Sequence, residues 1–232
     1  ILIISVYLYL PESASINKSL KLNPKGIFKD YKNVFTERSF LYFALASSIG
    51  MGGMFAYISG ASFVFMNYFE LSESTFGYIF SANAIGFIAG SQINRLLLNK
   101  YTSLQIITFA SVILVCVSFA MLITYSLDLI TLPVLVGLLI TFLFSLGLLV
   151  PNSTAMALAP FKKSAGSASA LIGFIQMLVG ASISAAVSAL HNDTILPMFL
   201  GMAFSGCGAF IVILMLNSQV KKGVLQHAYL KK

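Results

Sequence analysis

The sequence predicts an all-α integral membrane protein with six membrane-spanning helices. Of its 232 residues, 58% are hydrophobic and only 9% are charged. A soluble domain carries charges on about a quarter of its residues, and a helix needs about 20 apolar residues to cross the hydrocarbon of a bilayer. Apolar runs of that length recur along the chain. The predicted spans are residues 39–63, 75–94, 104–127, 130–157, 166–190 and 194–217.

An apolar stub, residues 1–10 (ILIISVYLYL), precedes these spans and is too short to cross a membrane. It has no initiating Met, basic leading region or small-residue cleavage site, so it does not resemble a secretory signal peptide. We therefore expect it to be the end of a truncated preceding transmembrane helix. On this interpretation the chain is the back part of a longer polypeptide, as a natural fragment or as a sequence that begins late.

Residues 11–38 are predicted to form a basic cytoplasmic linker. Within NPKGIFKDYKNVF, Asn23 and Pro24 are placed as a helix cap and a first helical residue. Apolar residues then recur at helical spacing with lysines among them, which predicts an amphipathic helix on the inner membrane face. A disordered basic linker is the alternative. Residues 39–217 form the predicted bundle, and residues 218–232 form a basic cytoplasmic tail.

Basic residues alternate between loops in a way that predicts the orientation of the bundle. They are Lys18, Lys21, Lys25, Lys29, Lys32 and Arg38 before the first span, Arg95 and Lys100 after the second, Lys162 and Lys163 after the fourth, and Lys221, Lys222, Lys231 and Lys232 after the sixth. The other loops contain only acidic charges. Because Lys and Arg are retained in the cytoplasm, we expect both ends of the bundle to be cytoplasmic.

The net charge of +7 follows from these loops. Orientation and attraction to anionic membrane lipids account for it. No nucleic-acid recognition motif is present, and we expect no nucleic-acid partner.

Small and polar residues on one face of a span indicate a helix contact or a cavity. The first span has two opposed stripes, of which we expect one to pack on a neighbour and the other to face a cavity. The sequence does not decide which is which. One stripe is Gly50, Gly53, Tyr57 and Gly60, and the other is Ser48, Met51, Phe55, Ser59 and Ser62.

Three further spans carry such stripes, and ordinary helix packing is the alternative to a cavity for each. The second aligns Phe76, Phe80, Asn83, Phe87, Gly90 and Asn94; the fourth aligns Gly137, Thr141, Ser145, Leu148 and Asn152, with Pro151 expected to kink it. The fifth aligns Gly166, Ser169, Gly173, Gln176, Gly180 and Ser184, which predicts a packing face. We expect the third and sixth spans to be peripheral.

Catalytic chemistry is not expected. All seven acidic residues lie in or beside loops, and no HExxH or GxSxG motif occurs. His191 is placed in a loop and His227 in the tail, so we predict neither a metal site nor a cofactor. A channel is also not expected, because no ring of polar or charged residues is apparent along a pore.

Several segments resemble a known family. They are LPES at the end of the stub, MFAYISGASFVF, FSANAIGFIAGSQIN and PNSTAMALAPFKKSAGSASALIGFIQ. Together they resemble the C-terminal half of a major facilitator superfamily transporter, in the bicyclomycin and chloramphenicol resistance (Bcr/CflA) group of drug:proton antiporters. GSQINR resembles a degenerate copy of the superfamily's cytoplasmic loop signature, with Asn94 where an acidic residue normally precedes the Arg.

The resemblance implies a secondary transporter of the bacterial inner membrane that exports small amphipathic or hydrophobic compounds by alternating access. Protons would be coupled through a carboxylate in an N-terminal half that this chain lacks. The expected substrate-cavity residues are Met51, Phe55, Tyr57, Ser59, Asn83, Phe87, Asn152 and Gln176. The expected helix-packing or gating residues are Gly90, Asn94, Arg95, Gly166, Gly173 and Gly180. An exporter of a metabolite such as an amino acid or a sugar, and a non-transporting truncated or split-gene fragment, are the alternatives.

Overall fold

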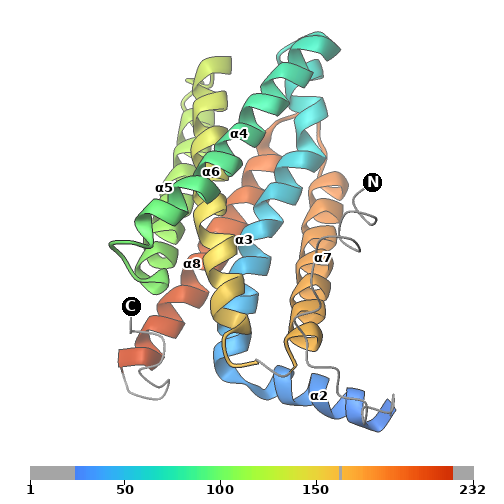
Figure 1. Cartoon of the computed structure of the whole chain (residues 1–232). Coiled ribbons are helices and arrows are strands. Elements are labelled where there is room, and N and C mark those ends of the chain that lie inside the picture. Colours follow the sequence, from blue (N-terminus) through green and yellow to red (C-terminus); the bar gives the residue numbers. More distant parts are fainter. Residues whose placement is uncertain (1–23, 162–163, 222–232) are drawn as a thin grey trace, which may run out of the picture.

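The computed structural model of the chain describes residues 24–161 and 164–221, and every regular element in these ranges is a helix (Figure 1). The elements are α2 (Pro24–Thr36), α3 (Arg38–Ser62), the π-helical segment η1 (Phe63–Tyr68), α4 (Glu73–Leu97), α5 (Ser103–Ser126), α6 (Leu132–Leu158), α7 (Ala165–Ala189) and α8 (Leu196–Lys221). The predicted all-α fold class is confirmed. The stub at residues 1–10 and most of the predicted tail lie outside the described residues.

Five helices in the described ranges are long and apolar enough to cross a membrane, which makes this a multi-pass membrane protein. They are Arg38–Tyr68, Ser103–Ser126, Leu132–Leu158, Ala165–Ala189 and Leu196–Val220. The remaining predicted span falls on α4, whose 25 residues extend about 37 Å. Helix α4 is long enough to cross but less apolar. Its buried residues include Asn83 and Asn94, whose side chains contact neighbouring helices.

The ends of α4 and α5 are defined by local hydrogen bonds. Ser72 caps α4 by accepting from the Thr75 N–H, and Thr102 and Gln105 form a reciprocal capping box on α5. Glu70, Asp128 and Asp193 each adopt a left-handed backbone with φ between 52° and 57°. These three lie in the loops that follow η1, α5 and α7, so one end of the bundle carries the acidic loops.

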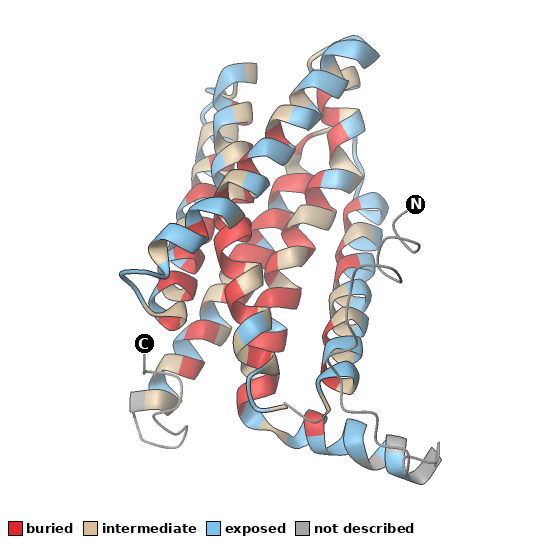
Figure 2. Ribbon diagram, in the orientation of Figure 1, coloured by how far each residue is buried: buried red, intermediate tan, exposed pale blue. Residues whose placement is uncertain are grey.

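Helix α3 is the centre of the bundle and packs against α6, α7 and α8. Helix α5 packs on α6 and α8, and α4 packs on α6, while α2 lies across one end of the bundle (Figure 1). Figure 2 shows buried residues concentrated on the inner faces of α3, α6 and α8, whereas α7 is largely exposed. Helix α8, expected to be peripheral, buries one face against α3 and α5 and exposes the face that carries Phe204.

The glycine stripe of α3 packs against α6 and α8. A Cβ added at Gly50 would lie 3.1 Å from the Leu149 side chain, and one at Gly53 would lie 2.5 Å from the Phe142 ring. These two positions bring α3 close to α6. The other stripe, which contains Met51 and Phe55, is half-buried.

Helices α4 and α6 cross at a point where their backbones touch. A Cβ at Gly90 would overlap the Phe144 carbonyl oxygen, and a Cβ at Gly147 would overlap the Phe87 carbonyl oxygen. At Gly86 it would lie 2.9 Å from the Ile140 carbonyl oxygen. Small residues permit such close approach between membrane helices. Close packing of this kind is one of the forces that hold helices together within lipid.

We predict that Gly147→Ala lowers the melting temperature of the purified protein in detergent. The added methyl group meets backbone, which cannot rotate away, so the expected cost is about 1–3 kcal/mol. Gly137→Ala is the matched control on the same helix, because no atom lies within 4 Å of a Cβ there. The control should be neutral or stabilised by up to about 1 kcal/mol. Equal melting temperatures for the two variants would contradict this assignment.

Candidate functional site

A buried pair joins α3 to α4 within the bundle. The Asn83 side-chain amide donates to the Tyr57 hydroxyl oxygen at 3.0 Å, and the two residues are 0% and 2% exposed. The Asn83 Oδ1 atom is buried and accepts no hydrogen bond from any described residue. A buried acceptor without a donor is costly, so this oxygen is ready to accept a donor that reaches it.

Aromatic rings surround this pair. The Phe80 ring stacks on Tyr57 with centroids 5.7 Å apart, and the Phe76 ring lies 5.8 Å from Phe80 and 5.9 Å from Phe65. The aromatic stripe predicted on α4 therefore packs against α3 and η1. Phe87 is half-buried and packs against the main core.

Helices α3 and α7 meet along the second stripe of α3. Phe55 fills the space beside Gly180, where a Cβ would lie 2.5 Å from the ring. The Ser59 and Ser184 hydroxyls hydrogen-bond at 2.8 Å. The Gln176 amide donates to the Ser47 hydroxyl at 3.4 Å.

Asn94 and Asn152 join α4 to α6 beside the glycine crossing. The Asn152 amide donates to Asn94 Oδ1 at 2.6 Å and to the Leu148 carbonyl at 2.7 Å. One turn away, the Ser91 hydroxyl donates to the Gly147 carbonyl at 3.3 Å. Pro151 has no N–H to bond that carbonyl four residues earlier. The Ser91 hydroxyl therefore supplies a donor that α6 itself lacks.

The predicted substrate-cavity residues are thus divided among three interfaces between helices, or seams. Tyr57 and Asn83 contact each other between α3 and α4; Phe55 and Ser59 face α7; Asn152 bonds α4. Met51 is half-buried and shares the Phe55 face by its spacing of four residues.

Among the predicted packing or gating residues, Gly90, Asn94 and Gly180 lie in close helix contacts. Arg95 is exposed, and no described atom lies within 4 Å of a Cβ added at Gly166 or Gly173. The glycine face of α7 is therefore packed near Gly180 and open toward the other end of the helix.

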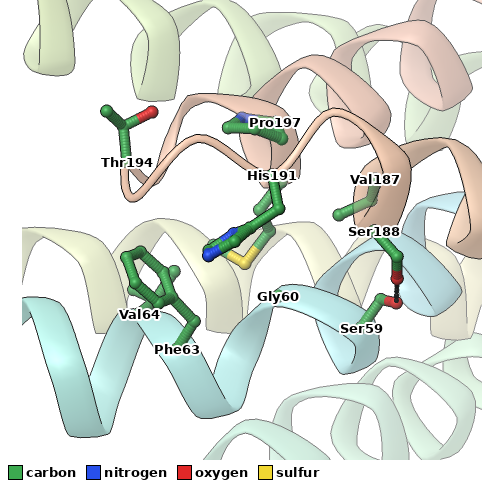
Figure 3. Close-up of a pocket in the computed structure, with 10 residues that line it drawn as sticks. Ser59, Gly60, Phe63, Val64, Val187, Ser188, His191, Thr194 and Pro197 are labelled. Atoms are coloured by element: carbon green, nitrogen blue, oxygen red, sulfur yellow. Dashed lines mark hydrogen bonds between the residues drawn. The ribbon is translucent and has the colours of Figure 1, made fainter.

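The sequence did not reveal a cavity at the acidic-loop end, between α3, η1, α7 and α8. It has a volume of about 220 Å³, and Figure 3 shows His191 and Phe63 side by side among the residues that line it. The ring centroids are 4.5 Å apart with an edge-to-face geometry, and His191 Nε2 lies 3.4 Å from Asp193 Oδ1. Ser59 and Ser188 bond at 3.3 Å at its rim. A π-helical turn often accompanies a functional site, but it could not be read from the residues of η1.

The chemistry available between the long helices is neutral. The charged residues of α3 to α8 are Arg38, Glu73, Arg95 and Lys221, all in a first or last turn. Amide, hydroxyl, thioether and aromatic groups line the seams instead. Such groups suit binding by shape and a few hydrogen bonds, and they do not constitute acid–base machinery.

Comparison with known proteins places this arrangement among transporters. A family model described as Major Facilitator Superfamily matches residues 1–185. The "Bicyclomycin resistance protein homolog" of Haemophilus influenzae is 26% identical over 208 residues, covering 90% of this chain and 51% of that protein. The "Uncharacterized MFS-type transporter YdgK" of Bacillus subtilis is 28% identical over 201 residues, covering 85% of this chain and 49% of that protein. The chain spans about half the length of these relatives.

We predict that Asn94 and Asn152 are energetically coupled. Asn94→Leu and Asn152→Leu should each destabilise the protein by about 1–2 kcal/mol, because each leaves the partner amide buried without its bond. The double variant should cost less than the two single changes together, by roughly 0.5–1.5 kcal/mol. Melting temperatures in detergent for the four-protein cycle test this. Ser81→Ala, at an exposed position of α4, is the control; strict additivity in the cycle would refute the coupling.

Proposed function

Because the chain belongs to the major facilitator superfamily, we propose that it forms one half of a secondary transporter that exports small amphipathic or hydrophobic compounds in exchange for protons. Members of this superfamily are transporters, not enzymes. The observation that carries the proposal is the similarity to a protein named for bicyclomycin resistance, which extends over 90% of this chain. The finer assignment to multidrug efflux rests on that similarity and on the neutral helix seams.

A second six-helix bundle completes the proposed transporter. The chain spans about half the length of the relatives it matches, and the superfamily is built from two six-helix halves around a site near the bilayer midplane. The open part of α7, with Gly166 and Gly173, supports a contact between halves because both positions lack a described neighbour. Alternating access would proceed by rocking of the halves about this face.

The proposed substrate wall lies on α3 and α4. Met51 and Phe55 contribute flexible and aromatic surface, which gives shape-tolerant affinity for apolar compounds. Asn83 contributes the acceptor oxygen that lacks a donor. When the seam between α3 and α4 loosens, a hydrogen-bond donor on the substrate can pair with that oxygen.

Proton coupling is assigned to a carboxylate in the second half. The charged residues of the described long helices lie in first or last turns, so we give none of them this role. The basic loops support an orientation with both ends of the bundle cytoplasmic. The relatives are bacterial, which supports the bacterial inner membrane as the location.

We predict that Asn83→Leu and Phe55→Ala change which compounds are exported. Resistance to some compounds of an amphipathic antibiotic panel, bicyclomycin included, should fall on the order of tenfold, as expected for the loss of one large apolar or hydrogen-bonding contact. Cells expressing the complete transporter are the assay system, with membrane levels measured in parallel. Phe119→Ala, on the exposed face of α5, is the matched control and should leave the profile unchanged.

Unchanged profiles for Asn83→Leu and Phe55→Ala would remove these residues from the wall.

A protonophore should abolish efflux if export is proton-driven. Efflux of amino acids or sugars instead of antibiotics would assign a metabolite exporter, and no efflux at all would assign a non-transporting fragment.

A further inference from the structure

Two grooves flank the first turns of α5 on the outside of the bundle. One has a volume of about 470 Å³ and is lined by Leu97, Tyr101, Gln105, Ile106 and Phe109. The other has a volume of about 590 Å³ and reaches Asn217 on α8. Gln105 and Phe109 line both grooves, so these two side chains form a ridge between them.

Two hydrogen bonds within the protein use polar groups along these grooves. Gln105 accepts from the Thr102 N–H in the capping box, and the Asn217 amide donates to the Thr108 hydroxyl at 3.1 Å. The Phe109 ring is 61% exposed. The groove walls also include the apolar residues Leu97, Ile106 and Val112, a surface that suits hydrocarbon chains.

A positive charge lies close to the first groove. The Lys100 Nζ atom lies 5.6 Å from the centroid of the Tyr101 ring, and Tyr101 lines that groove. The sequence contains no Asp or Glu between Glu73, at the opposite end of α4, and Asp128, after the far end of α5, so no carboxylate near the loop between these helices competes for the ammonium group. Tyr and Lys at the end of a membrane helix mark the headgroup level of the bilayer.

We propose that this surface is a binding site for one anionic phospholipid. Lys100 pairs with the phosphate-bearing headgroup, and the two acyl chains lie in the two grooves on either side of the Gln105 and Phe109 ridge. A basic residue beside an apolar groove between membrane helices is the arrangement that recognises anionic lipids. The inference does not depend on the proposed transport activity.

A third groove provides a contrast within the same molecule. It lies between α7 and α8, has a volume of about 650 Å³ and is lined by mostly apolar residues that include Leu190, Leu200 and Phe204. No Lys or Arg lines it, and the loop that joins these helices contributes Asp193. This groove should accept acyl chains without regard to headgroup charge.

The chain contains no Trp, so a single Trp can report on each groove by its fluorescence. We predict that Phe109→Trp, reconstituted in phosphatidylcholine vesicles, is quenched more strongly by brominated phosphatidylglycerol than by brominated phosphatidylcholine at equal mole fraction. The expected preference is about fivefold in relative association constant for one basic group, and it should fall in 1 M salt. Phe204→Trp should show no preference.

Two charge-removing variants in the Phe109→Trp background separate the lipid site from general surface attraction. Lys100→Gln should abolish the preference. Arg95→Gln should retain it, because Arg95 is two residues from Leu97 on α4 and so points about 200° away from the groove. Equal quenching of Phe109→Trp by the two lipids, an equal preference at Phe204→Trp, or a preference that survives Lys100→Gln would each overturn the proposal.

Discussion

The carbonyl of Gly147 is left without a donor in its own helix, because Pro151 follows four residues later and has no N–H. Hydrocarbon contains no water to replace that donor, so another part of the protein has to supply one. The hydroxyl of Ser91 on α4 does so. It can approach because Gly90 and Gly147 allow the two backbones to touch at this level. A proline in α6 thus requires close contact with α4, and the paired amides of Asn94 and Asn152 complete it.

This crossing organises the bundle around it. Since α6 is held to α4 on one side and packs on α3 through Phe142 and Leu149 on the other, three helices form a continuous block in which Tyr57 meets Asn83. Helix α7 packs along α3 through the hydroxyl pair of Ser59 and Ser184 and the ring of Phe55 beside Gly180. The polar side-chain contacts between helices in the described ranges are neutral, which keeps the cost of placing them in hydrocarbon low compared with ion pairs.

The outer surface of the bundle differs in its side chains from the interior. Exposed rings such as Phe109 and Phe119 on α5 face outward and suit a hydrocarbon solvent. In the long helices α3 to α8, charges are confined to first and last turns. The loops that carry Glu70, Asp128 and Asp193 lie at one end of the bundle, and the loop that carries Lys100 lies at the other, so the two ends differ in the charge that they place beside a groove.

The sequence by itself determined the all-α fold class, the helices within a few residues, and the small-residue stripes, because hydrophobic length and helical period are local properties. It also identified Asn94 and Asn152 as members of stripes on two different spans. Only the tertiary structure decided that these two residues bond each other, that the glycine stripe of α3 packs on α6 and α8 while its other stripe packs on α7, and that Gly166 and Gly173 are open while Gly180 is filled. A stripe in the sequence indicates which residues share a face of one helix. Which helix packs on that face depends on how helices distant in the chain are arranged. The sequence likewise did not predict the cavity lined by His191, because its walls come from four elements that no local pattern connects.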